Sequence, residues 1–388
     1  MDKSDRTRKV ERATSLLTAT PLAVAVGAEL LIYRPDTAVG PSEIRRLPFE
    51  VPNNNRLLLK LEHLTRYSAT GSLYDRLYAS LFAHYEAGGY IAPRVTPLIE
   101  GSVGNAGAAF AHVAQVRGYH DYTVLLPQDI YPARIDQIRR LGAKVLFSPK
   151  NTAELGYVEI LEAMVRDAWR GRKRLRGDVD RLFPVSKVLR VPNAPYARLL
   201  WEVLEAAGRA GLPQHIDYFV FGVGAGNTIS EVGRAIKTMS RGLRKVVAVE
   251  FTENPFVALL KAGRRPPVGG PWPAGAIAET ISGVPLDKLN LDLEIIDAVS
   301  PITAAERKVG RQMANEELAL FAGRPTGGLI YKALELAGKV SDTNILTIVF
   351  DSIAKYGDEY EPIWDIDFGT NAVVQSPQVM ERLALLSV

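Results

Sequence analysis

The chain has 388 residues, of which 47% are hydrophobic and 23% charged, values that are ordinary for a soluble globular protein. It has no cysteine, which excludes disulfides, thiolate catalysis and cysteine-based metal sites, and its net charge of +4 is too small to argue for nucleic acid. Because it shows neither a long apolar run nor a secretory leader, we expect a cytoplasmic protein without membrane, nucleic-acid or metal partners.

Strand and helix patterns alternate along most of the chain. Residues 1–20 are expected to form a charged helix or arm, and the apolar stretch at 21–35 fits a strand or a helix equally well. This alternation predicts a mostly parallel sheet with helices on its faces, interrupted by a proline- and glycine-rich excursion at 261–290. The expected strands are 56–62, 96–101, 123–127, 144–149, 217–221, 245–251 and 344–351, and the expected helices are 72–88, 108–119, 133–143, 197–211, 229–243, 304–323 and 327–339.

A glycine-rich loop at 221–228 follows one strand and precedes a helix. Its glycines permit close approach of a ligand to the backbone, and the free N–H groups of a helix N-terminus suit a phosphate. A Walker loop would need Lys followed by Ser or Thr after the last glycine, where Asn227 and Thr228 stand, and a dinucleotide fingerprint would need glycine at position 227. A tight turn without a ligand remains the alternative.

Seven segments occur in an order that is more specific than any one of them. They are Lys60-Leu61-Glu62 with Thr70-Gly71-Ser72-Leu73-Tyr74-Asp75-Arg76, Ser102-Val103-Gly104-Asn105-Ala106-Gly107, Arg139-Arg140-Leu141-Gly142-Ala143, Asn193-Ala194-Pro195, Gly224-Ala225-Gly226-Asn227-Thr228, Ala322-Gly323-Arg324-Pro325-Thr326-Gly327-Gly328, and Asp351-Ser352. In this order the chain resembles the cysteine synthase-like family of fold-type II enzymes that depend on pyridoxal phosphate (PLP). The resemblance extends from about residue 45 to 356.

The resemblance implies an α/β fold with two three-layer αβα domains and twisted, mostly parallel sheets, as in the tryptophan synthase β-like superfamily. Residues 1–45 would form an N-terminal arm. Residues 46–92 and 185–388 would form the larger cofactor domain, and residues 93–184 a smaller mobile domain that carries the substrate loop. The resemblance also implies a homodimer.

The resemblance further implies a role for each matching site residue. Asn105 would hydrogen-bond the 3-oxygen of the PLP ring, although it could also simply begin a helix. Thr326 would offer a hydroxyl to the pyridine nitrogen. The PLP phosphate would be bound by Gly224, Ala225, Gly226, Asn227 and Thr228, and a substrate carboxylate by Ser102, Val103, Gly104, Asn105 and Ala106.

Tyr74 stands where the family has the lysine that forms an imine with PLP. A phenol cannot form an imine, and its ordinary pKa of about 10 makes it a poor base near neutrality. Val103 and Ala106 replace hydroxyl residues of the substrate loop, whereas the phosphate loop is altered less. The sequence therefore suggests that the protein keeps ligand binding but has lost the turnover that depends on lysine.

Three functions remain open from the sequence. The first is a divergent or inactive homologue that binds PLP or a related phosphate ligand without a covalent bond. The second is an active β-replacement or β-elimination enzyme that acts on a serine-like amino acid and uses Tyr74 as a surrogate base. The third is a structural or regulatory partner whose cofactor pocket is filled, so that PLP is absent.

Overall fold

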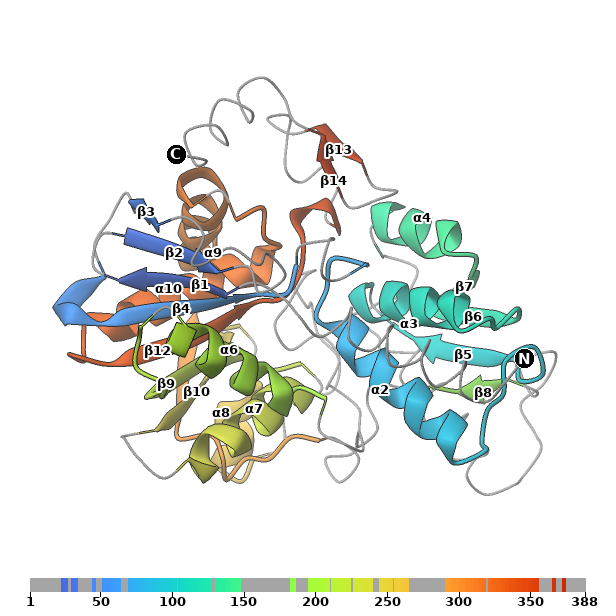
Figure 1. The fold of residues 1–388 in the computed structure, drawn as a ribbon, viewed down its shortest axis with the longest axis horizontal. Coiled ribbons are helices and arrows are strands. Elements are labelled where there is room, and N and C mark those ends of the chain that lie inside the picture. Colours follow the sequence, from blue (N-terminus) through green and yellow to red (C-terminus); the bar gives the residue numbers. More distant parts are fainter. Residues whose placement is uncertain are drawn as a thin grey trace.

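The fold is built from two sheets of different size, seen in a computed structural model (Figure 1). Val103, Ala225, Asn193, Ala194, and most of segments 1–45 and 265–289 lie outside the described part of the chain. The structure describes residues 51–63, 69–102, 104–126, 130, 132–147, 182–185, 195–209, 211–224, 226–239, 244–253, 255–264, 290–318 and 320–355, with the backbone of five further strands.

The larger sheet has eight strands in the order β11-β10-β9-β12-β4-β1-β2-β3. The five strands from β11 to β4 run parallel, with Ile345 of β12 opposite Leu57 of β4 and Tyr218 of β9. All six residues of β12 are buried, as expected for a strand covered on both faces. The parallel strands are β4 (Arg56–Leu61), β9 (Tyr218–Gly222), β10 (Lys245–Phe251), β11 (Ala298–Ile302) and β12 (Asn344–Val349).

The ambiguous apolar stretch of the sequence is a pair of strands. Strands β1 (Leu22–Val26) and β2 (Glu29–Tyr33) pair antiparallel, and β3 (Ile44–Arg46) extends this edge. Because β1 also pairs antiparallel with β4, the larger sheet is mixed rather than purely parallel. A further antiparallel pair joins β13 (Asp365–Asp367) to β14 (Ala372–Val374).

Helices cover both faces of the larger sheet (Figure 1). On one face α7 packs on β9 and β10, with α6 and α8 beside it, and on the other face α10 packs on β9 and β12, with α9 against α10. These helices are α6 (Ala197–Arg209), α7 (Asn227–Thr238), α8 (Phe256–Lys261), α9 (Ala304–Gln312) and α10 (Arg324–Ala337). The α/β fold class predicted from the sequence is confirmed.

The smaller sheet has four parallel strands in the order β7-β6-β5-β8. Helix α3 packs on β5 and β6, and α2 and α4 pack against α3. The ring of Phe110 on α3 contacts Tyr78 and Phe82 of α2, at 5.9 Å between centroids in each case. The elements are α2 (Tyr74–Ala87), β5 (Leu98–Gly101), α3 (Asn105–Val116), β6 (Tyr122–Leu126), α4 (Pro132–Arg140), β7 (Lys144–Phe147) and β8 (Phe183–Pro184). The domain boundaries proposed from the sequence stay a prediction.

One predicted helix is shorter than its sequence pattern suggests. The expected helix 304–323 is α helical only to Gln312 and continues as a π-helical turn, Met313–Glu317. The buried amide of Asn315 then binds the backbone of Ala322 at both ends: its Nδ2 donates to the carbonyl at 3.0 Å, and its Oδ1 accepts from the N–H at 2.7 Å. This amide stabilises the chain reversal before α10, a contact that a helical periodicity does not reveal.

Candidate functional site

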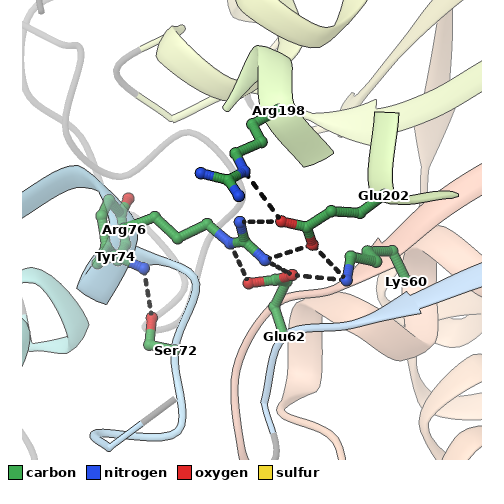
Figure 2. Close-up of polar contacts among 7 residues, drawn as sticks. All are labelled: Lys60, Glu62, Ser72, Tyr74, Arg76, Arg198 and Glu202. Atoms are coloured by element: carbon green, nitrogen blue, oxygen red, sulfur yellow. Dashed lines mark hydrogen bonds and ion pairs between the residues drawn. The ribbon is translucent and has the colours of Figure 1, made fainter. Parts of the chain in front are cut away.

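Tyr74 is the first residue of α2. The preceding loop is fixed to the end of the larger sheet by an isolated bridge between Ser72 and Asp351, and the Tyr74 N–H donates to Ser72 Oγ at 3.4 Å (Figure 2). The half-buried Tyr74 ring lines a small cavity. The chain therefore positions a phenol, through backbone contacts, at the carboxyl end of the parallel strands, where ligands of α/β proteins usually bind.

The cavity has a volume of about 40 Å³, which is room for about three water molecules. Four described parts of the chain form its walls: the start of α2, the segment from the end of β9 into α7, Tyr196 just before α6, and Phe350 just after β12. Among the residues that the structure describes, no lysine lines the cavity. The described lining residues are Leu73, Tyr74, Tyr196, Phe221, Gly222, Gly224, Gly226, Asn227, Thr228, Ile229 and Phe350.

The loop between β9 and α7 has the geometry of an anion site. Gly226 has φ of +85°, and a Cβ atom there would lie 2.6 Å from the Cα of Leu291, so only glycine fits. Helix α7 begins at Asn227 and runs for 12 residues, and Asn227 and Thr228 of its first turn line the cavity. Backbone N–H groups in a first helical turn lack helical partners and favour an anion.

Two buried tyrosines accompany Tyr74. Burial raises the pKa of Tyr78 and of Tyr196 well above the ordinary value, and neighbouring phenols and carboxylates add to the rise. Glu231 of α7 accepts the Tyr196 N–H at 2.7 Å, and burial raises the pKa of this carboxyl to about 7 against that hydrogen bond. The phenols of Tyr78 and Tyr196 thus remain protonated and uncharged near neutral pH.

The loop predicted to bind a substrate carboxylate is held together by Ser102. Its buried hydroxyl accepts the N–H groups of Gly104 at 2.9 Å and Gly107 at 2.7 Å. Gly104 has φ of +142°, and a Cβ atom there would meet the side chain of Arg134 at 2.3 Å. Ala106 is buried. The Ser102 oxygen therefore organises the start of α3.

Asn105 and Thr326 lie outside the described residues that line the cavity, and Asp351 contacts Asn105 and the segment just before α10. Asn105 Nδ2 donates to Asp351 Oδ2 at 3.0 Å. The Asp351 carboxylate also approaches Gly323, where a Cβ atom would meet it at 2.3 Å, just before Thr326 in the first turn of α10. Asn105 Oδ1 and the hydroxyl of the fully buried Thr326 have no hydrogen-bond partner among the described residues.

These features fit a PLP-type ligand in part. The α7 loop suits the phosphate, and the two buried oxygens without partners suit a polar ring. The small cavity beside Tyr74 does not suit a substituted pyridine ring unless the tyrosine side chain moves.

The predicted residues Tyr74, Gly224, Gly226, Asn227 and Thr228 come together in one cavity. Sequence reasoning missed Tyr196, Phe221 and Phe350 as wall residues, because aromatic residues in a buried pattern are normally core.

A buried ion network fixes the position of α2 (Figure 2). Arg76 Nε lies 2.8 Å from Glu62, and its Nη2 lies 2.8 Å from Glu202, which also lies 2.9 Å from Lys60 Nζ. Burial lowers the pKa of Lys60, and the nearby carboxylates of Glu62 and Glu202 only partly oppose this shift. For Arg76, burial would also lower the pKa, but the same two carboxylates raise it above its ordinary value. The positive charges of Lys60 and Arg76 thus offset the negative charges of Glu62 and Glu202. Arg76 follows Tyr74 by two residues in the chain.

Lys355 is a buried lysine on the short helical turn Ile353–Lys355. Its ammonium group donates to Gln137 Oε1 of α4 at 3.0 Å. Burial lowers its pKa to about 8, against the opposing field of Asp75 and Asp351. Lys355 does not line the cavity, so it is not placed as a substitute for the lysine that Tyr74 replaces.

Among the residues with described positions, no helix is long and apolar enough to cross a membrane. Nor do three histidine or acidic side chains in those ranges gather closely enough to hold a metal ion.

Comparisons with known proteins agree with the fold. The family described as pyridoxal-phosphate dependent enzyme matches residues 36–351. Cysteine synthase A of Salmonella typhi is 29% identical over 306 residues, covering 78% of this chain and 87% of that protein. O-ureido-L-serine synthase of Streptomyces lavendulae is 27% identical over 314 residues, covering 79% and 85%.

Solved structures give the same result. A crystal structure of O-ureido-L-serine synthase matches with a TM-score of 0.63 at 21% identity, over 95% of this chain and 98% of that one. O-acetyl serine sulfhydrylase isoform 3 of Entamoeba histolytica matches with a TM-score of 0.66 at 22% identity, over 96% and 95%. At these identities the likeness establishes the fold alone.

Proposed function

Because this chain belongs to the cysteine synthase-like family of pyridoxal-phosphate dependent enzymes, we propose that it binds PLP or a related phosphate ligand without a covalent bond. In this proposal it lacks the turnover that depends on an imine-forming lysine. PLP, when bound, supplies an electron sink for amino-acid chemistry. We propose that the chain works in the cytoplasm as a homodimer.

One observation carries this proposal: Tyr74 and the start of α7 line the same cavity, and no lysine in the described part of the chain lines it. The N–H groups of the first turn of α7 would hold the phosphate. Asn105 would bind the ring oxygen and Thr326 the ring nitrogen, which would satisfy two oxygens that otherwise lack partners. Entry of the ring would require the Tyr74 side chain to turn away from the cavity.

PLP titration of the wild-type chain and of a Tyr74→Lys variant tests this function. The wild-type chain should bind PLP reversibly, and borohydride reduction should leave no covalent adduct. Tyr74→Lys should develop the visible absorbance of an imine, because the substitution removes the ring and supplies an amine. A reduced adduct on any wild-type lysine, found by peptide mapping, would contradict the proposal, and Lys355 is the first position to inspect.

Two glycine variants test whether the α7 loop is the phosphate site. Gly226→Ala should abolish binding of PLP and inorganic phosphate and lower the free energy of unfolding by about 3 kcal/mol, because the residue is left-handed and its methyl group meets Leu291. Gly263→Ala is the matched control, since Gly263 has φ of +69° with nothing within 4 Å. It should cost about 1–2 kcal/mol and leave binding intact.

The active-enzyme alternative has a direct assay. With PLP present, the wild-type chain is mixed with serine, O-acetylserine, O-phosphoserine or cysteine, and absorbance is followed. The names of the relatives, which are synthases of amino acids, favour this alternative, whereas Tyr74 disfavours it. Spectral turnover that is lost in Tyr74→Phe would assign Tyr74 as the base. If no PLP binds and Tyr74→Lys also fails to form an imine, the filled-pocket function gains support instead.

A further inference from the structure

Lys355 lies where elements of the two sheets meet. It ends the helical turn Ile353–Lys355, which follows β12 of the larger sheet, and it is only 1% exposed. Helix α4, which packs against α3 and β7 of the smaller sheet, binds it twice. The Lys355 ammonium group donates to Gln137 Oε1 at 3.0 Å, and the Lys355 carbonyl accepts Arg134 Nε at 3.3 Å. One lysine therefore joins elements of both sheets.

Burial has the largest influence on the Lys355 amine, and it lowers the pKa to about 8. Three described charged groups face the amine from the elements packed against it. Asp75 of α2 and Asp351, just after β12, favour the ammonium form, whereas Arg134 of α4 disfavours it. The two carboxylates therefore compensate the buried positive charge only in part.

Both carboxylates are also bound by other groups. Asp75 accepts the Thr70 hydroxyl at 2.6 Å and the Thr70 N–H at 3.0 Å, and Asp351 accepts Asn105 Nδ2 at 3.0 Å. These hydrogen bonds hold the carboxylates in place, so neither is free to turn toward Lys355. Because Asn105 begins α3, its bond to Asp351 also crosses between the two sheets.

The direction of a proton's effect follows from the surroundings of the amine. Separation of α4 from residues 353–355 would return the amine to water, where its pKa is 10.5. The separated arrangement therefore binds the proton more tightly than the joined one. The contribution of Lys355 to the joined arrangement is fully present above pH 10.5 and is lost as the pH falls through 8. A neutral amine still has N–H groups to donate to Gln137, so this hydrogen bond does not require the charge.

We propose that Lys355 makes the contact between the two sheets sensitive to protons: proton uptake by its amine favours separation of α3 and α4 from the end of the larger sheet, and proton loss favours their joining. The joined arrangement brings Asn105 to Asp351, so the proton on Lys355 shifts the equilibrium that assembles these parts of the candidate site. This inference concerns the fold and does not depend on whether PLP binds.

Regional hydrogen exchange of the full chain at pH 7 and pH 9 tests the inference. Protection factors, which are corrected for the intrinsic exchange rate at each pH, report the opening equilibrium. We expect the slowest-exchanging amides of α3 and α4 to be protected roughly tenfold more at pH 9, as follows from pKa values of about 8 and 10.5 for the joined and separated arrangements. Amides of β9 and β12 should change much less, because the larger sheet stays intact when α4 separates.

Two lysine variants distinguish Lys355 from other groups that titrate. Lys355→Met keeps a long side chain without a charge, so protection in α3 and α4 should be the same at both pH values. Lys339→Met is the matched control, because the Lys339 side chain is 66% exposed, and it should keep the tenfold change. Carbon-13 NMR of the lysine side chains, with Lys355 assigned through Lys355→Arg, should show Lys355 of the wild-type chain titrating near pH 8.

Three results would overturn the inference. The first is equal protection of α3 and α4 at the two pH values in the wild-type chain, or a change that persists in Lys355→Met. The second is a change of the same size in β9 and β12, which would assign the proton uptake to unfolding of the whole chain. The third is titration of Lys355 above pH 10. None of these results bears on the titration with PLP, so the proposed function is tested separately.

Discussion

Single residues near the cavity carry charges that are unusual for their surroundings. Glu231 is only 2% exposed, yet it accepts backbone N–H groups at the start of α6 and an amide hydrogen of Asn290 at 3.3 Å. Burial outweighs these bonds and raises its pKa. Glu231, which holds the backbone of Tyr196 in place, thus makes the free energy of unfolding depend on pH.

The direction of this pH dependence follows from the pKa of Glu231 in the folded and the unfolded protein. The pKa of Glu231 is about 7 in the native state and 4.5 in the absence of structure, so the native state binds the proton more tightly. The stabilisation is present below pH 4.5 and is lost as the pH rises through 7. Urea unfolding at pH 5 and pH 8 should show a loss larger by about 2–3 kcal/mol in the wild-type chain than in Glu231→Gln. Equal losses in the two proteins would rule out this titration.

At the scale of secondary-structure elements, β4 and α2 are joined through charges rather than through apolar contacts alone. Glu62, one residue beyond β4, and Glu202 of α6 both bind Arg76 of α2. Three elements thus meet at one guanidinium group, whose side chain is 2% exposed. Since Tyr74 lies half a turn before Arg76 on α2, this network determines how α2 begins at the cavity.

Removing the central cation should be costly. Arg76→Leu leaves Glu62 and part of Glu202 buried without their strongest partner, so we expect the free energy of unfolding to fall by about 3–5 kcal/mol. Arg198→Ala is the matched control, because Arg198 is 63% exposed and lies 3.8 Å from Glu202. It should change stability by about 0.5 kcal/mol or less in chemical denaturation. Similar losses for both variants would contradict the assigned role of the network.

Across the whole molecule, the two sheets are connected by polar contacts between α4, α3 and the end of β12. Gln137 of α4 accepts the Lys355 ammonium group, and Asn105 of α3 binds Asp351. Gln137 Nε2 also donates to the carbonyl of Thr70, in the loop before α2, at 3.4 Å. The elements that carry the candidate site residues are therefore held together by hydrogen bonds to buried charges, which are stronger than ordinary ones.

The connection between the sheets can be tested at Gln137. Gln137→Ala should lower the free energy of unfolding by about 1–3 kcal/mol, because it removes an acceptor from the buried ammonium group of Lys355. Arg139→Ala, at an exposed position of the same helix, should stay within about 0.5 kcal/mol of the wild-type chain. If Gln137→Ala unfolds at the same urea concentration as Arg139→Ala, the contact contributes little.

The sequence alone determined the features that depend on residues close together along the chain, namely the secondary-structure pattern and the motifs. Periodicity predicted most helices and strands of the α/β fold, the order of motifs indicated the family, and Tyr74 at the position of the family's lysine raised the question of function. Periodicity did not reveal β11, α8 or the π-helical turn after Gln312. Strand β11 contains a proline and has one buried residue, α8 has only six residues, and the π-helical turn continues directly from α9.

Only the tertiary structure decided what surrounds Tyr74. The aromatic residues that line the cavity come from positions 74, 196, 221 and 350, and the Asn105–Asp351 hydrogen bond spans 246 positions of the chain. Such contacts arise from the packing of two sheets, which no local pattern encodes. The cavity between Tyr74 and the start of α7 is a product of that packing.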